Sequence, residues 1–139
     1  MGDLEIREGE NWVELTLPGS LLFPSAEAEL EAEAEQRLRQ LIEILAQGEN
    51  AILVEGFTDD LPIRTERFPS NWELSAARAA AVVRFMEAEG IGPHRLGAVG
   101  HGANHPVARN DTERGREANR RVVILVSADQ AMPSMAPAR

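Results

Sequence analysis

The sequence predicts an α+β domain, a two-layer α/β sandwich in which one β-sheet carries helices packed on a face. Two observations lead to this prediction. Short segments with strand-like patterns occur in turn with two long segments of helical periodicity. A chain of 139 residues can bury one core but is too short for two. We therefore expect one domain over residues 1–128, with its core at about 12–127.

The N-terminal segment, residues 4–17, alternates apolar and polar side chains around a turn near Gly9. This period of two predicts a hairpin or two short strands, which Pro18-Gly19 end. A long helix is expected after Ser25 and up to about Gln47, because its apolar positions recur at helical spacing. They form one stripe of Leu30, Ala34, Leu38, Leu41 and Leu45.

The middle of the chain predicts a buried strand followed by a second helix. Residues 51–56 form a short apolar run, and a proline-containing stretch comes after it. Ser70-Asn71-Trp72-Glu73 has the pattern of a capping box, in which the serine hydroxyl bonds to the backbone of Glu73 and Glu73 reaches back. The second helix is therefore expected from this box to about residue 89.

The C-terminal part predicts two further strands, over 95–100 and 122–126, with a short helical turn near 113–118 between them. The last 11 residues, 129–139, are rich in Ala, Pro and Met. We expect them to form a frayed or disordered tail.

Composition excludes several classes of function. A formal net charge of -9 argues against nucleic-acid binding, which needs a basic surface to neutralise phosphates. The chain has no cysteine and therefore no disulfide or cysteine metal site. No segment approaches the roughly 20 apolar residues that cross a bilayer. Apart from the histidines, every basic side chain is an arginine, whose planar guanidinium suits carboxylates.

The residues that point to chemistry lie between the middle strand and the second helix. Residues 58–60, Thr-Asp-Asp, follow the strand, where open α/β sheets commonly bind ligands. Asn71, Ser75 and Arg78 are spaced by four and three and share one face of the helix. Arg78 has no acidic neighbour at three or four residues. It either points to water or meets a charge from another element, with Asp59 or Asp60 as the nearest candidate.

Other patterns are weaker. His101 and His105 lie four residues apart on a glycine-rich loop, where turn histidines are a better interpretation than a metal site. Ser75, His101 and Asp59 could be drawn as a catalytic triad, but no G-x-S-x-G elbow supports it. The segment 119–121 is either a basic ligand contact or a solvated lead-in to the last strand. We expect no metal and no cofactor.

Three motifs give the chain a family resemblance. Residues 56–59, Gly-Phe-Thr-Asp, resemble the G-[HY]-T-D signature of OmpA-like peptidoglycan-binding domains. Residues 71–79 match their N-x-x-L-S-x-x-R-A pattern, and residues 119–122 match their N-R-R-V. The segment 58–75 is more similar to the B subunits of flagellar stators, the MotB and MotD proteins, than to porins or Pal lipoproteins. The resemblance covers about 12–127 and implies an OmpA-like mixed β-sheet with helices on one face.

The resemblance also implies a ligand and its site. In the family, the aspartate of the T-D pair and the arginine of the helix hold diaminopimelate, the cross-linking residue of the wall peptide. These positions are Asp59 and Arg78 here. The side-chain end of diaminopimelate is a zwitterion, which a carboxylate and a guanidinium facing each other complement. Supporting contacts are expected from Thr58, Asn71, Leu74 and Arg121.

By the same resemblance, the chain is a non-catalytic periplasmic domain of an inner-membrane protein that anchors a flagellar stator to peptidoglycan. Its implied partners are peptidoglycan, a second copy of itself and a stator A subunit, the last through a transmembrane part absent from this chain. A general OmpA- or Pal-type anchor without a motor role is one alternative. A peptidoglycan hydrolase that uses Asp59 and Ser75 is another.

Overall fold

The computed structural model describes residues 4–128, so the tail predicted over 129–139 lies outside the described part. Its framework is one five-stranded sheet in the order β1-β2-β5-β3-β4. All neighbouring strands pair antiparallel except β3 and β4, which are parallel, so the sheet is mixed as expected. The strands are β1 (Glu5–Glu8), β2 (Trp12–Pro18), β3 (Ile52–Phe57), β4 (Leu96–Gly100) and β5 (Arg121–Ser127).

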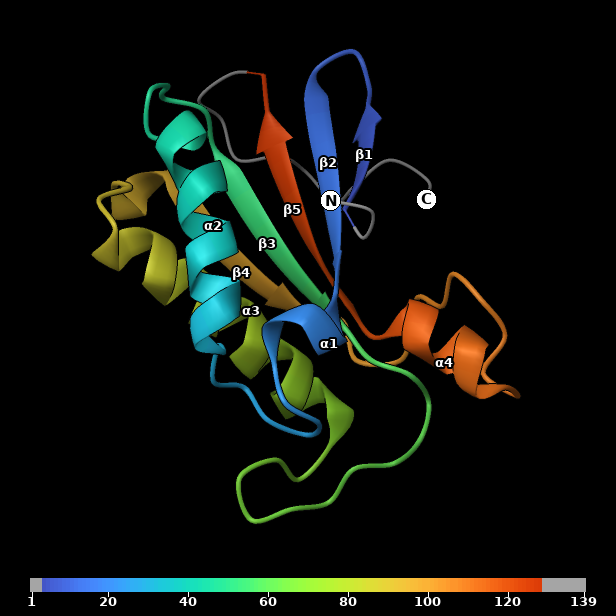
Figure 1. Ribbon diagram of the computed structural model, residues 1–139. Coiled ribbons are helices and arrows are strands. Elements are labelled where there is room, and N and C mark those ends of the chain that lie inside the picture. Colours follow the sequence, from blue (N-terminus) through green and yellow to red (C-terminus); the bar gives the residue numbers. More distant parts are fainter. Residues whose placement is uncertain (1–3, 129–139) are drawn as a thin grey trace.

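Two long helices, α2 (Ala32–Leu45) and α3 (Asn71–Ala88), lie on the same face of this sheet (Figure 1). Three shorter helical segments complete the fold, α1 (Gly19–Leu22), the 3-10 turn η1 (Pro93–Arg95) and α4 (Glu113–Asn119). The prediction of an α+β two-layer domain is therefore confirmed. No helix among residues 4–128 combines the length and the apolar character needed to cross a membrane.

The start of α2 differs from the prediction. The sequence pattern places the helix directly after Ser25, whereas it begins at Ala32. Ala26 has φ of 60°, a left-handed conformation that does not belong to a right-handed helix. The short helix α1 was also missed, and the segment between α1 and α2 is irregular.

The core lies between the sheet and the two long helices. Alternate residues of β2, β3 and β5 face it, and the predicted helix stripe supplies buried Ala34 and Leu38 with partly buried Leu30, Leu41 and Leu45. On α3 the same cluster includes the buried residues Ala79, Ala81, Val82 and Met86. Its fully buried members include Val54, Ile124, Leu38, Val82 and Met86.

Two glycines bring α3 close to the sheet. A Cβ atom on Gly56 of β3 would collide with the backbone of Ser75, and one on Gly100 of β4 would collide with the backbone of Ala76. Both strands are parallel and end at the same edge, with α3 as their crossover. The first turns of α3 therefore lie directly against the strand ends, near the segment that follows β3 (Figure 1).

Candidate functional site

A groove lies at the carboxyl end of β3, between α1, the segment after β3 and the first turns of α3. Its cavity volume is about 460 Å³. The structure brings five of the six predicted site residues together in its lining, Thr58, Asp59, Asn71, Leu74 and Arg78. The groove thus joins the end of a strand to one face of a helix, as the spacing in the sequence indicates.

Asp59 is the buried carboxylate of this groove, with only 7% of its surface exposed. Its Oδ1 accepts a hydrogen bond of 3.0 Å from the backbone N–H of Leu61. Its Oδ2 accepts one of 2.6 Å from Nη1 of Arg120. The hydroxyl of Thr58 donates to the backbone carbonyl of Asp59 at 2.7 Å. Thr58 therefore holds the backbone of the aspartate, while the carboxylate itself pairs with a cation.

Arg78 is also buried, with 6% of its surface exposed. Its Nε donates to the carbonyl of Glu27 at 2.7 Å, and its Nη2 donates to the carbonyl of Pro24 at 3.2 Å. The guanidinium carbon lies 4.9 Å from the centre of the Phe23 ring. The interpretation that Arg78 points to water is therefore wrong, because the irregular segment between α1 and α2 holds it in place.

The charge of Arg78 is kept at a cost in free energy. Burial and, to a smaller extent, the nearby charge of Arg120 lower the pKa of its guanidinium to about 10, while Asp59 opposes the shift. The group remains protonated at neutral pH. A buried cation with a perturbed pKa in a groove is a common feature of functional sites.

Asn71 and Leu74 complete the helix side of the groove. The amide Nδ2 of Asn71 donates to the carbonyls of Leu61 at 3.0 Å and of Asp59 at 3.4 Å, which ties the segment after β3 to the helix. Leu74 is buried and packs with Phe68. These two residues shape the groove and position its aspartate.

The capping box at the start of α3 is present in a modified form. The hydroxyl oxygen of Ser70 accepts from the backbone N–H of Trp72 at 3.2 Å, rather than from Glu73 as expected. The same hydroxyl donates to the carboxylate of Glu73, and this hydrogen bond lowers the pKa of Glu73. The first turn of α3 is therefore fixed by local hydrogen bonds.

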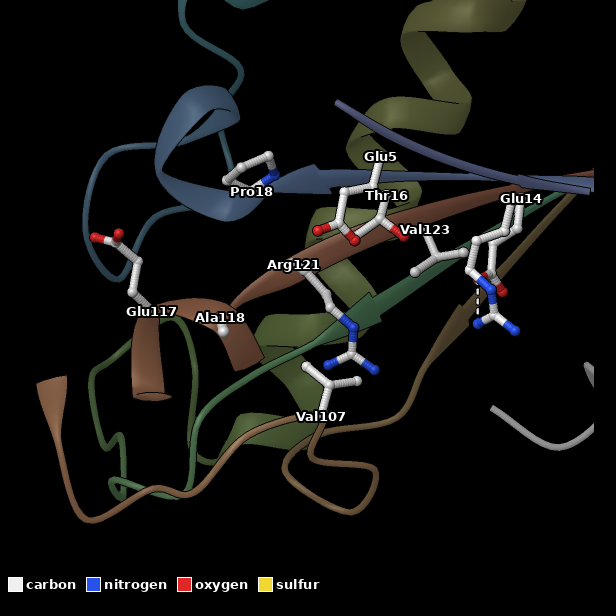
Figure 2. A pocket seen from close by; sticks show the side chains of 10 residues that line it. Glu5, Glu14, Thr16, Pro18, Val107, Glu117, Ala118, Arg121 and Val123 are labelled. Atoms are coloured by element: carbon white, nitrogen blue, oxygen red, sulfur yellow. Dashed lines mark hydrogen bonds and ion pairs between the residues drawn. The ribbon is translucent and has the colours of Figure 1, made fainter. Parts of the chain in front are cut away.

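Arg121, the sixth predicted residue, does not line the groove. It lines a smaller pocket of about 240 Å³ on the sheet face opposite α2 and α3, together with Glu14, Thr16 and Val123, and we call this the open-face pocket (Figure 2). Its Nη1 and Nη2 donate to the carbonyls of Asn119 and His105 at 3.2 and 3.1 Å. The structure therefore does not bring Arg121 together with the other five predicted residues, and its support of the ligand stays a prediction.

Arg120 takes the place in the groove that was expected of Arg121. It has an extended backbone, so its side chain and that of the next residue point to opposite sides of the sheet. Val122 belongs to the core on the helix side, which places Arg120 on that side as well. The sequence alone does not show this alternation, because residues 122–126 are all apolar and do not reveal which side faces the core.

Glu113 of α4 is a second groove residue that the sequence did not reveal. Its Oε2 accepts a hydrogen bond of 2.5 Å from Nη2 of Arg120. Asp60, the other aspartate considered, is exposed and lies near a different surface segment, 106–111. Of the two adjacent aspartates, only Asp59 belongs to the groove.

The arrangement does not assemble the triad that could be drawn from the sequence. Ser75 has no exposed surface, and its hydroxyl donates to the carbonyl of Trp72 and accepts from the N–H of Gly102. His101 instead pairs with Glu55, at 2.8 Å between Nε2 and Oε2. Among residues 4–128 no group of three or more His, Cys, Asp or Glu side chains could hold a metal ion.

Comparison with known proteins agrees with the geometry. The model of the OmpA family matches residues 22–120. The chain is 40% identical over 129 residues to YtxE of Bacillus subtilis, an uncharacterized protein, covering 92% of this chain and 53% of that protein. The cell wall anchor of the T6SS from Pseudomonas aeruginosa has a similar structure, with a TM-score of 0.88, 35% identity and coverage of 92% of this chain and 90% of the other.

The periplasmic domain of Helicobacter pylori MotB is also similar, with a TM-score of 0.83, 31% identity and coverage of 91% of this chain and 82% of the other. The chain therefore belongs to the OmpA family, and its sheet and helices have the fold of the MotB periplasmic domains. This is a class of non-catalytic, peptidoglycan-binding domains. The chain spans about half the length of the curated relatives it matches.

Proposed function

We propose that this domain binds the diaminopimelate of peptidoglycan in the groove and anchors a MotB-like flagellar stator to the cell wall from the periplasm. The observation that carries the proposal is the pair of buried, opposite charges, Asp59 and Arg78, in the lining of one groove. Burial of a charge is unfavourable unless a partner compensates it. Arg120 compensates the carboxylate of Asp59, whereas the hydrogen bonds of Arg78 go to backbone carbonyls, so a ligand carboxylate would supply the counter-charge for Arg78.

The chemistry of the groove complements a zwitterion. The carboxylate of Asp59 suits the ligand's ammonium, and the guanidinium of Arg78 suits the carboxylate on the same carbon. Two nitrogens of Arg78 are held by backbone carbonyls, which fixes the guanidinium plane. Nη1 lies close to Gly19, where an added Cβ atom would be 3.4 Å from it, and both residues line the groove.

The motor role is supported by the similarity to MotB proteins in both sequence and structure. A general wall anchor without a motor remains the second candidate, because the similar T6SS protein is itself a cell wall anchor. The sequence upstream in the intact protein distinguishes them. A single transmembrane helix with an acidic residue supports the stator, whereas a lipobox or barrel strands support the alternative.

The stator hypothesis implies two protein partners. One is a stator A subunit, contacted through a transmembrane part, and the other is a second copy of this domain. Self-association is expected through a surface away from Asp59, so that the groove stays accessible. Analytical ultracentrifugation at high micromolar concentration tests it for this domain. A strict monomer would contradict self-association of the isolated domain while leaving the ligand proposal intact.

Co-sedimentation with purified peptidoglycan tests ligand binding. Asp59→Asn removes the buried negative charge from the groove. Asp60→Asn is its matched control because Asp60 is the adjacent, exposed aspartate. We expect Asp59→Asn to stay in the supernatant while Asp60→Asn pellets like the unmodified domain. Circular dichroism confirms that both variants are folded. A folded Asp59→Asn that still pellets would contradict the proposal.

A further inference from the structure

Arg120 lies between two carboxylates in the groove. Its Nη1 donates to Asp59 at 2.6 Å, and its Nη2 donates to Glu113 at 2.5 Å. The two pairs differ in their exposure to water. The side chain of Asp59 is 10% exposed, whereas that of Glu113 is 65% exposed, and that of Arg120 is 28% exposed. The inner pair, Arg120–Asp59, is therefore stronger than the outer pair, Arg120–Glu113, because water screens the outer pair.

The charges around Arg120 couple the two arginines of the groove. Burial alone would lower the pKa of Arg120, but hydrogen bonds to Glu113 and Asp59 outweigh burial and raise it. The positive charge of Arg120 in turn lowers the pKa of Arg78. The guanidiniums of Arg78 and Arg120 therefore repel each other across the groove. Arg120 already forms an ion pair with the buried carboxylate of Asp59.

We propose that Arg120 is an internal counter-ion that competes with the ligand's ammonium for Asp59, and that this competition selects zwitterionic ligands over simple amines. The inference rests on the proposed function and adds a residue that sets its specificity. When an ammonium binds Asp59, Arg120 loses its inner partner and retains Glu113. Glu113 therefore determines how readily Arg120 gives up its ion pair with Asp59.

The selection follows from charge. An amine without a carboxylate adds a third cation beside Arg78 and the displaced Arg120, and these repel it. A ligand that carries its own carboxylate next to the ammonium compensates the guanidiniums as it enters. The ligand's ammonium and Arg120 thus compete for one carboxylate, and only the zwitterion restores the balance of charge.

The test is calorimetric titration with two matched muropeptides, one with diaminopimelate and one with lysine at the same position. In Arg120→Gln the affinity for the lysine muropeptide should rise by about three- to tenfold, since a partly buried competing ion pair is lost. The affinity for the diaminopimelate muropeptide should rise less, so that the ratio of the two affinities falls. Glu113→Gln should act in the opposite direction and weaken lysine binding by about twofold.

Two further variants make the outcome decisive. Arg120→Lys keeps the charge and should keep the ratio within about twofold of the unmodified value, because a lysine still competes for Asp59. Glu117→Gln is the matched control for Glu113→Gln, since Glu117 is exposed on the same helix and lines the open-face pocket. It should change neither affinity.

An unchanged ratio of the two affinities in a folded Arg120→Gln would overturn the inference. If both affinities fall equally, Arg120 only supports the groove. If the unmodified domain binds neither muropeptide, the proposed function itself fails, and one set of titrations distinguishes this failure from the failure of the inference.

Discussion

The groove and the open-face pocket are two depressions on opposite sides of the same sheet, and each is lined by a buried arginine. Arg78 in the groove is 6% exposed, and Arg121 in the open-face pocket is 5% exposed. Both guanidiniums donate to two backbone carbonyls and lie over a phenylalanine ring. Burial and hydrogen bonding alone therefore do not distinguish the arginine that we propose to bind the ligand from the one that we propose to support the fold.

The difference lies in what surrounds each arginine. The ring centre of Phe57 is 3.8 Å from the guanidinium carbon of Arg121, compared with 4.9 Å between Phe23 and Arg78. Arg78 also faces a larger cavity that contains a buried carboxylate and a second arginine. Arg121 is thus packed as part of the fold, whereas Arg78 is presented to a space that a charged ligand can fill. The comparison makes opposite predictions for the two residues.

The largest expected effect is the loss of ligand affinity in Arg78→Gln. Removing one partner of a buried charge pair typically costs about 2–5 kcal/mol of binding free energy, which is at least about thirtyfold in affinity. Because Arg78 also holds two backbone carbonyls, its loss should lower the free energy of unfolding by about 1–3 kcal/mol. Calorimetric titration with a diaminopimelate muropeptide and urea denaturation measure the two effects.

Two variants serve as controls for that measurement. Arg84→Gln removes an exposed arginine from the same helix and should leave both affinity and stability unchanged. Arg78→Lys retains the charge but cannot donate to two carbonyls and to a ligand in the same planar geometry. It should bind with intermediate affinity. Full affinity in a folded Arg78→Gln would place the binding cation elsewhere in the groove.

The second effect is discrimination between wall peptides with diaminopimelate and with lysine. Lysine keeps an ammonium for Asp59 but lacks the carboxylate, so Arg78 is desolvated without an anion. We expect at least about a tenfold loss of affinity, or about 1.4 kcal/mol. In Arg78→Gln the preference should fall to the part that competition with Arg120 contributes. An undiminished preference there would assign the carboxylate to Arg120, the other cation of the groove.

Much of this site could be predicted from the sequence. Spacing placed Asn71 and Arg78 on one helix face, the lack of an acidic helical neighbour left Arg78 in need of another partner, and the family motifs selected Asp59. The actual hydrogen-bond partners of Arg78 are backbone carbonyls of Pro24 and Glu27. Side-chain patterns carry no information about such carbonyls, which depend on how an irregular segment folds.

The errors have physical causes of the same kind. The helix pattern extended α2 too far toward the N-terminus because polar and alanine residues there suit a helix, yet Ala26 adopts a left-handed conformation. The motif at 119–122 names two arginines without saying which one faces the helices. Only the pairing register of β5, where Val122 and Ile124 face the core, assigns the sides. Glu113 was missed because its role depends entirely on Arg120.

Arg121→Gln should have the smallest effect on binding, and it is the sharpest test of the comparison between Arg78 and Arg121. This change removes a cation that is adjacent to Arg120 in sequence and belongs to the same family motif. If the alternation of side chains is correct, the affinity for a diaminopimelate muropeptide should stay within about twofold of the unmodified value, because Arg121 lines the open-face pocket instead.

Stability should respond in the opposite way. Arg121→Gln loses two hydrogen bonds to backbone carbonyls and the contact with the ring of Phe57, so the free energy of unfolding should fall by about 1–3 kcal/mol. Urea denaturation measures this loss, and titration below the unfolding transition measures affinity on the folded fraction. An affinity loss as large as that of Arg78→Gln, in a folded variant, would show that the open face of the sheet contributes to the ligand site. A large loss of stability with unchanged affinity, together with the affinity loss expected in Arg78→Gln, would establish that one of these two buried arginines serves binding and the other serves the fold.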